Sequence, residues 1–335
     1  MNKSIAKKTS VKAFVKSLIT PKISKEISSH FIELDKKSLA GIETALRTHF
    51  FVQQDAWYSN PNYLNSAEGQ EDLQEHLTKR LETFRISVIP WLNSARPLAN
   101  SRILEIGCGT GVSTVALAEQ GAKVTAIDVV EDSLIVARKR CEAYGLNVDL
   151  RLANSTDIHT LFADQHFDFV IFFACLEHMT HRERMISMKN TWEMLAPSGL
   201  WCVIETPNRL WHYDQHTAHL PFYSWLPDEL AFMYSRLSPR KPFSDLYHEM
   251  SEDSMLDFLR RGRGVSYHEF ELTMKPVEQL DVVSSLSGFI KSRNLLTKIL
   301  WSLKDRNAFE SLLVKLGPKI HRGFYLSSLD LIIKK

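Results

Sequence analysis

Five short apolar stretches, separated by segments with helical spacing, constrain the fold of this 335-residue chain more than any other feature. They read RILEI (102–106), KVTAID (123–128), VDLRLA (148–153), FDFVIFFA (167–174) and GLWCVIE (199–205). Gly121 and Gly145 stand where the first two intervening helices should end, since glycine favours the position after a helix. The alternation predicts an α/β fold in which a mostly parallel sheet has helices on both faces.

The remaining chain divides around this core. We expect an N-terminal helical extension over residues 1–95 and one α/β domain over 96–335. VSYHEFEL (265–272) is predicted to be a sixth strand, and GFYLSSLDLIIKK (323–335) contains a seventh. Two insertions, at about 206–250 and 273–322, are expected to form helical caps.

A glycine-rich turn follows the first strand in ILEIGCGTGVST (103–114), and turns of this kind bind nucleotides. A triphosphate loop needs a lysine after its last glycine, and none follows Gly111. A dinucleotide turn has the spacing GxGxxG, but its third glycine position is Val112 here. The spacing GxGxG, preceded by Glu105, therefore favours a third kind of nucleotide site.

ILEIGCGTG closely resembles the first motif of class I S-adenosylmethionine-dependent methyltransferases. The later segment FDFVIFFACLEHM, followed by LAPSG and by a strand ending in TPNR, resembles the ubiquinone-biosynthesis type of this superfamily. Together these motifs cover roughly residues 100–210. The resemblance implies a Rossmann-like seven-stranded methyltransferase sheet and S-adenosyl-L-methionine as cofactor.

The resemblance also assigns the cofactor site. Glycines let the backbone approach the cofactor, Glu105 suits its cationic methionine end, and Asp128 can accept both ribose hydroxyl groups. Asp128 could instead cap the following helix. The adenine should lie against LANSTDI (152–158), where the family's usual acid is replaced by a neutral polar residue. The cofactor-binding residues expected are Glu105, Gly107, Cys108, Gly109, Thr110, Gly111, Asp128, Val129, Asn154, Ser155, Thr156 and Phe172.

Methyl transfer requires alignment of the acceptor and, for a hydroxyl group, removal of its proton. Glu177 and His178 follow the fourth strand at the edge of the sheet where ligands bind, so they are the catalytic candidates. They could equally cap the next helix. Ubiquinone-type relatives can bind a divalent metal with a further acid three residues before the glutamate. That position is Ala174 here, so no metal is expected.

The first insertion begins with RLWHYDQHTAHLPFYSWLP (209–227), which is rich in histidine and aromatic residues. Its prolines and aromatics favour an irregular lid over a substrate pocket. Structural packing and a zinc site made of its three histidines are the alternatives. The substrate-binding residues expected are Asn208, Arg209, His212, His216, His219 and Tyr223.

We expect O-methylation of a small-molecule, lipid or glycan acceptor. A non-catalytic cofactor-binding protein and a nicotinamide-dependent dehydrogenase are the alternatives, and the oligomeric state stays open. The motif of amino-methylating DNA enzymes is missing after the fourth strand, so nucleic acid is not an expected partner. No transmembrane segment is predicted. The basic segment 1–25 is expected to be a solvated tail, and the basic stretch within 285–335 a helical pair with a solvated face; contact with a membrane surface is the alternative for both. Four cysteines without metal-type spacing favour the cytoplasm.

Overall fold

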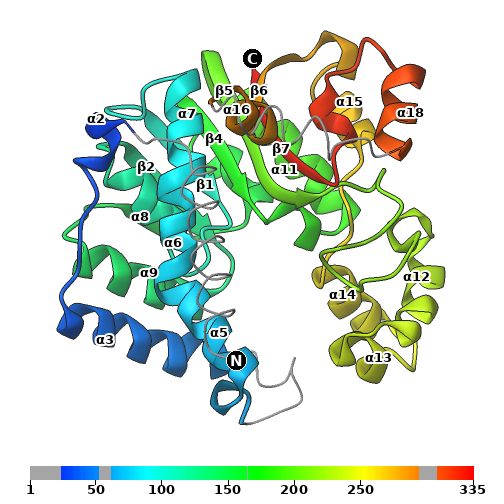
Figure 1. The fold of residues 1–335 in the computed structure, drawn as a ribbon, viewed down its shortest axis with the longest axis horizontal. Coiled ribbons are helices and arrows are strands. Elements are labelled where there is room, and N and C mark those ends of the chain that lie inside the picture. Colours follow the sequence, from blue (N-terminus) through cyan, green and yellow to red (C-terminus); the bar gives the residue numbers. More distant parts are fainter. Residues whose placement is uncertain (1–23, 53–61, 164, 294–307) are drawn as a thin grey trace, which may run out of the picture.

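Seven strands form one mixed sheet in the computed structural model, which describes residues 24–52, 62–163, 165–293 and 308–335 (Figure 1). The strand order is β3-β2-β1-β4-β5-β7-β6, and β7 runs antiparallel to both of its neighbours. This sheet confirms the predicted Rossmann-like α/β fold. The strands are β1 (Arg102–Ile106), β2 (Lys123–Asp128), β3 (Asp149–Leu152), β4 (Phe167–Phe173), β5 (Leu195–Pro207), β6 (Asp281–Ser285) and β7 (Ser328–Lys334).

Each face of the sheet has its own hydrophobic core. Because successive side chains of a strand point to opposite faces, Ile103 enters one core and Leu104 the other. The first core contains α8 (Val112–Ala118) and α9 (Glu131–Ala143). The second contains α10 (Ile158–Leu161), α11 (His181–Glu193) and α15 (Tyr267–Thr273).

The N-terminal extension packs on the first of these faces. Residues 67–95 are helical throughout and include α5 (Ala67–Gln74), α6 (Arg80–Thr83) and α7 (Ile89–Ala95); α2 (Lys25–Ser28) and α3 (Lys36–Ala45) precede them. Their apolar side chains share one core with the sheet. Arg85 also pairs with the buried Glu119, at 2.6 Å. The basic segment 1–23 and residues 53–61 lie outside the described residues.

The predicted sixth strand, VSYHEFEL, is wrong. Its residues form helix α15 instead, because Ser266 caps the helix and the Glu269 carboxylate accepts the Ser266 backbone N–H at 2.6 Å. Val265 contributes only an isolated bridge to Asn208. The sixth strand is Asp281–Ser285, which lies inside the segment that we expected to be a helical insertion.

The first insertion is longer than expected and extends from residue 209 to 264, a segment that we call the cap. It contains α12 (Asp228–Tyr234), α13 (Lys241–Leu246) and α14 (Glu252–Arg260), which stand apart from the sheet in Figure 1. A third hydrophobic core, built around Phe232, Phe243 and Phe258, holds the cap together.

The second insertion adds α16 (Leu286–Arg293) and α18 (Ala308–Leu316), and part of its basic stretch, 294–307, is not described. Across the described part of the chain, the helices are too short or too polar to cross a bilayer.

Candidate active site

The glycine-rich turn joins β1 to α8 at the carboxyl edge of the sheet. Gly107, Gly109 and Gly111 all have positive φ angles, of +72°, +51° and +78°. A side chain at any of them would be strained, because residues with a Cβ rarely adopt this conformation. The turn therefore depends on glycine at all three positions.

Asp128 ends β2 beside this turn. Its Oδ2 accepts the backbone N–H of Gly109 at 2.7 Å, and its Oδ1 accepts that of Val130 at 2.9 Å. Burial raises the pKa of Asp128, whereas these N–H groups lower it. Each carboxylate oxygen keeps a second lone pair, so Asp128 can still accept hydroxyl groups of a ligand.

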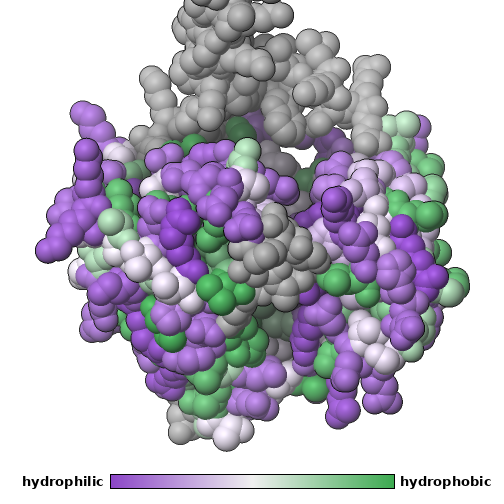
Figure 2. Space-filling model, turned by 90° about the horizontal axis from the view of Figure 1, so that it is seen from below, coloured by the Kyte–Doolittle hydropathy of each residue, from purple (hydrophilic) through white to green (hydrophobic). Residues whose placement is uncertain are grey.

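A cavity of about 760 Å³ opens over the turn. Its floor contains Gly107, Gly109 and Asp128, and its wall contains Val129, Asn154 and Ser155 from the ends of β2 and β3. The opposite wall belongs to the cap. Figure 2 looks onto this side of the molecule, which is hollowed between two lobes with many hydrophilic side chains. The cavity is large enough for a nucleoside-sized ligand.

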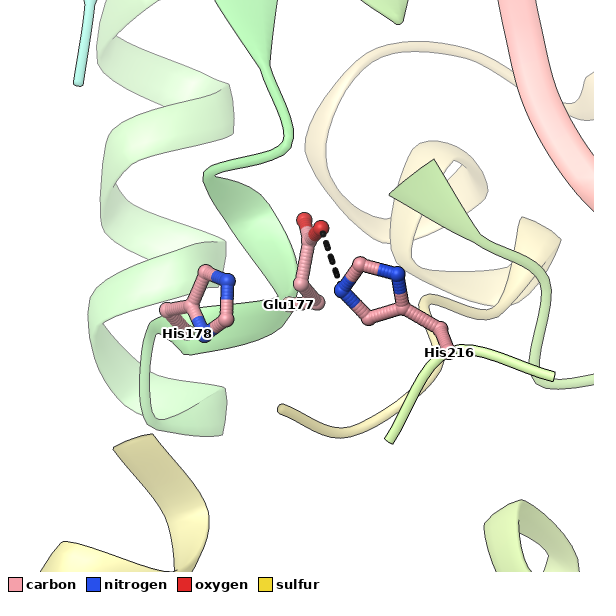
Figure 3. Close-up of side chains that lie close together, drawn as sticks. All are labelled: Glu177, His178 and His216. Carbon is pink, nitrogen blue, oxygen red and sulfur yellow. Dashed lines mark ion pairs between the residues drawn. The ribbon is translucent and has the colours of Figure 1, made fainter. Parts of the chain in front are cut away.

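Three polar side chains meet at the border of this cavity: Glu177 and His178 after β4, and His216 from the cap (Figure 3). Glu177 is fully buried, and its Oε1 lies 3.6 Å from His216 Nε2. Its Oε2 accepts the Thr206 hydroxyl at 3.3 Å, whereas Oε1 has no hydrogen-bond partner. His178 Nδ1 donates to the Arg260 carbonyl at 2.8 Å, which leaves Nε2 with a free lone pair when the ring is neutral.

The loop that carries His216 is organised by one buried carboxylate. Asp214 accepts the backbone N–H groups of His216, Thr217, Ala218 and His219. Arg240 donates to the carbonyl groups at 216 and 217, at 3.0 and 2.6 Å. These contacts position the imidazole of His216 at the edge of the sheet, 38 residues along the chain from His178.

A second cavity, of about 410 Å³, adjoins the first, and Ala174 and His216 line both. Its walls include Trp211 and Tyr213 of the cap and Glu205 at the end of β5. Ala174 and Glu205 have positive φ angles, +41° and +57°. Strained backbone of this kind is concentrated at functional sites. Two adjoining cavities that share Ala174 and His216 suit a reaction between two ligands.

Comparison with known proteins relates the central part of the chain to a family. A family described as "Methyltransferase domain" matches residues 103–199. The chain is also 33% identical over 119 residues to a ubiquinone biosynthesis O-methyltransferase of Thiobacillus denitrificans, covering 36% of this chain and 50% of the relative. The protein of the same name from Ruegeria pomeroyi is 35% identical over 118 residues, or 35% of this chain and 46% of the relative. Residues 103–199 therefore match a methyltransferase domain, and this part of the chain is similar to S-adenosylmethionine-dependent O-methyltransferases.

These matches cover only part of each protein, since the chain spans about half the length of the curated relatives it matches. Among solved structures, it is similar to magnesium protoporphyrin IX methyltransferase from Synechocystis PCC 6803. That similarity has 18% identity and a TM-score of 0.36, over 53% of this chain and 79% of the other. The match over residues 103–199 supports the methyltransferase alternative over the dehydrogenase alternative.

Half of the predicted cofactor residues of this methyltransferase line the larger cavity, and half do not. Gly107, Gly109, Asp128, Val129, Asn154 and Ser155 line it. The residues outside its lining are Glu105, Cys108, Thr110, Gly111, Thr156 and Phe172.

Glu105 and Phe172 point away from the cavity for identifiable reasons. Glu105 is fully buried and accepts the hydroxyl groups of Ser113 and Thr114, and burial raises its pKa to about 7. This carboxyl group therefore joins β1 to α8 instead of meeting the cofactor. Phe172 packs against Trp201 in the core, with ring centroids 5.1 Å apart, which corrects its assignment to the cofactor site.

Three arginines of the cap also line the larger cavity, and no sequence pattern singled them out. Arg240, Arg260 and Arg261 lie opposite the glycine-rich turn. Their positive charge suits an anionic group of a ligand, such as a carboxylate. Arg260 and Arg261 end α14, and basic residues at a helix end are too common to signal a site in the sequence.

Most of the predicted substrate residues have structural contacts instead. Only Asn208 and His216 line the smaller cavity. The Asn208 amide group donates to the carbonyl groups of Phe324 and Leu326, at 2.7 and 2.8 Å, so it fastens β5 to the C-terminal segment.

The other four predicted substrate residues lie outside both cavities. His212 packs between Trp211 and Phe309, and Tyr223 is fully buried under the Arg263 guanidinium group. His219 contributes its backbone N–H to the hydrogen bonds that Asp214 accepts, and its φ angle is +53°. Arg209 is half-buried, and burial together with the nearby Arg263 lowers its pKa.

The three histidines of the first insertion, considered above as a zinc site, do not come together in the structure. Among the described residues, the group that could hold a metal ion combines His216 with Glu177 and His178, not with His212 and His219. The ligand atoms of these three residues all lie within 4.8 Å of one another.

Proposed function

We propose that this methyltransferase transfers the methyl group of S-adenosylmethionine to an oxygen atom of a small-molecule, lipid or glycan acceptor. The observation that carries this proposal is the junction of the two cavities at Ala174 and His216. One cavity contains the glycine-rich turn and Asp128, and the other reaches the polar cluster from the opposite side. A donor and an acceptor bound there would meet beside Glu177 and His178.

In this proposal, the larger cavity binds the cofactor. Asp128 accepts the ribose hydroxyl groups, Asn154 and Ser155 border the adenine, and the arginines of the cap face the carboxylate of the methionine part. The exposed faces of Gly107 and Gly109 allow the ligand to approach the backbone closely.

The acceptor occupies the smaller cavity, with its hydroxyl group beside Glu177, His178 and His216. Methyl transfer is an in-line displacement, so most of the acceleration comes from holding the acceptor oxygen, the methyl group and the sulfur in a row. The polar cluster is where the hydroxyl group loses its proton. The O-methyltransferase names of the relatives support oxygen as the accepting atom.

Calorimetric titration with S-adenosylmethionine and separately with NADH tests the cofactor assignment. We expect micromolar binding of S-adenosylmethionine, no binding of NADH, and about 100-fold weaker binding in Asp128→Ala, as loss of a buried charged acceptor costs roughly 3 kcal/mol. Failure of S-adenosylmethionine to bind would contradict the proposal.

Mass spectrometry of acceptor mixtures incubated with labelled cofactor then tests the transfer. Methylated hydroxyl compounds are expected. Cofactor binding without any methylated product in a broad screen would support the non-catalytic alternative. The cytoplasmic location and contact with a membrane surface stay predictions.

A further inference from the structure

The polar cluster has the composition of a metal centre. We propose that Glu177, His178 and His216 bind one divalent transition-metal ion, with the cap supplying the third ligand. Two imidazole groups and one carboxylate, with a further position left open, are a ligand set that catalytic zinc sites use. The binding itself is independent of the proposed function, and only the role of the ion in methyl transfer rests on it.

The distances are close to those that an ion requires. Metal–ligand bonds of about 2.1 Å place ligand atoms about 3.4 Å apart in a tetrahedral site. His216 Nε2 and Glu177 Oε1 are already 3.6 Å apart, and all three ligand atoms lie within 4.8 Å of one another. Small rotations of the side chains drawn in Figure 3 would bring them around one ion.

The environment of Glu177 also favours a bound cation. Its carboxyl group is fully buried, and Oε1 has no hydrogen-bond partner. Buried carboxylates are ordinarily paired with a cation or bound to a metal, since an unpaired buried charge is costly. The nearby guanidinium groups are engaged elsewhere: Arg240 donates to carbonyl groups of the cap, and Arg260 pairs with Glu183.

The ring of His178 is held as metal ligands usually are, and the backbone around His216 is fixed. A ligating imidazole commonly donates its other N–H to a carbonyl or carboxylate, which orients the ring. His178 Nδ1 donates to the Arg260 carbonyl at 2.8 Å, so its Nε2 is the free ligand atom. The His216 loop is organised by the four backbone N–H groups that Asp214 accepts.

This site differs from both metal sites considered in the sequence. Where relatives carry an acid three residues before the glutamate, this chain has Ala174. His216 of the cap supplies the third ligand in its place. An ion in this position would tie the cap to the edge of the sheet. It would also face the border of both cavities, where its open position could bind the acceptor oxygen and lower the pKa of the hydroxyl group.

The test uses the whole 335-residue chain, first stripped of metal with EDTA. Titration with Co²⁺ should give the visible absorption bands of a bound ion and saturate at one ion per chain, and calorimetry with Zn²⁺ should give the same stoichiometry. His216→Ala and Glu177→Gln should each weaken binding by more than the roughly 100-fold that loss of a hydrogen-bonding partner of a metal ligand costs.

His212→Ala and His219→Asn are the matched controls, because they remove the two other histidines of the same segment. Asparagine suits position 219, whose φ is positive. Both should keep the wild-type metal affinity. The proposal is overturned if no ion binds, if His216→Ala still binds one ion with wild-type affinity, or if the control variants lose the ion instead.

Cofactor binding is measured on the same samples. If His216→Ala still binds S-adenosylmethionine, the variant is folded. Its loss of metal binding would then result from the removed ligand and not from unfolding. A protein that binds the cofactor but no ion would leave the proposed function standing and overturn only the metal site. A protein that binds the ion but not the cofactor would support the metal site and contradict the proposed function.

Discussion

The cofactor side and the cap side of the site are built in different ways. On the cofactor side, Gly107, Asp128 and Asn154 follow three neighbouring strands, so the parallel sheet brings them together. On the cap side, His216 reaches the same cavity from a loop that no sheet positions, held by Asp214 and Arg240. The cofactor side therefore depends on backbone conformation within a short motif, whereas the cap side depends on a few long-range polar contacts.

The largest expected effect tests the backbone requirement of the cofactor side. In Gly111→Ala the new Cβ would lie 2.9 Å from the Cβ of Ala137 and 3.0 Å from its Cα, at a φ of +78°. Conformational strain and overpacking together should lower the free energy of unfolding by about 3 kcal/mol. Urea denaturation measures it. Gly145→Ala has a positive φ but open space, so it should lose only about 1 kcal/mol. Equal losses of unfolding free energy in the two variants would mean that the contact with Ala137 adds nothing to the cost of the Gly111→Ala substitution.

A second, smaller effect tests the polar contacts of the cap side. Asp214→Ala removes the acceptor of four backbone N–H groups, and the loop should lose about 2 kcal/mol of local stability in total, because water can replace part of these hydrogen bonds. Amide hydrogen exchange at residues 216–219 should accelerate by about 10- to 100-fold, while affinity for S-adenosylmethionine stays within about twofold. Asp245→Ala, on the exposed surface of α13, should change neither. Unchanged exchange in Asp214→Ala would show that other contacts hold the loop.

The pH dependence of stability tests how the cap is attached. His181 on α11 lies 3.6 Å from Asp228 of α12 and 3.6 Å from Glu269 of α15, and these two carboxylates raise its pKa to about 9. Since the folded state binds this proton more tightly, the stabilisation is complete below pH 6.5 and is lost as the pH rises through 9.

For a side chain exposed by 44%, solvent screening reduces this contribution to about 1 kcal/mol. The difference in unfolding free energy between wild type and His181→Gln should therefore shrink by that amount between pH 6 and pH 9.5. His159→Gln, which removes an exposed histidine paired with Glu193, is the control. A difference that does not vary with pH would contradict the raised pKa.

The smallest expected effect concerns the link between the N-terminal extension and the smaller cavity. Arg80 of α6 pairs with Glu205 of β5, and both side chains are more than a third exposed. Exposed pairs of this kind contribute little, so Arg80→Ala should lower the free energy of unfolding by about 0.5 kcal/mol. Denaturation with urea is the measurement, and Arg47→Ala, which breaks a comparable exposed pair with Glu43, is the reference. A loss above about 2 kcal/mol would show that the extension depends on this contact.

Sequence patterns predicted the cofactor half of the molecule well and the cap half poorly. The five apolar stretches form β1 to β5, and Gly107, Gly109 and Asp128, which are predicted to bind the cofactor, line the larger cavity. The sixth strand was misplaced because VSYHEFEL alternates like a strand, whereas its helix depends on the Ser266–Glu269 capping box. Glu105 and Phe172 were assigned to the cofactor from motif position alone, and their burial between elements could not be read from spacing.

What the sequence by itself determined is the sheet and the turn that follows its first strand, because strand periodicity and glycine backbone conformation are local properties of the chain. Only the tertiary structure decided which histidine of the cap faces the sheet. His212, His216 and His219 are equivalent in the sequence, yet only His216 meets Glu177 and His178. Its position results from Asp214, Arg240 and the core of the cap acting together, and contacts between residues far apart in the chain leave no periodic trace in the sequence.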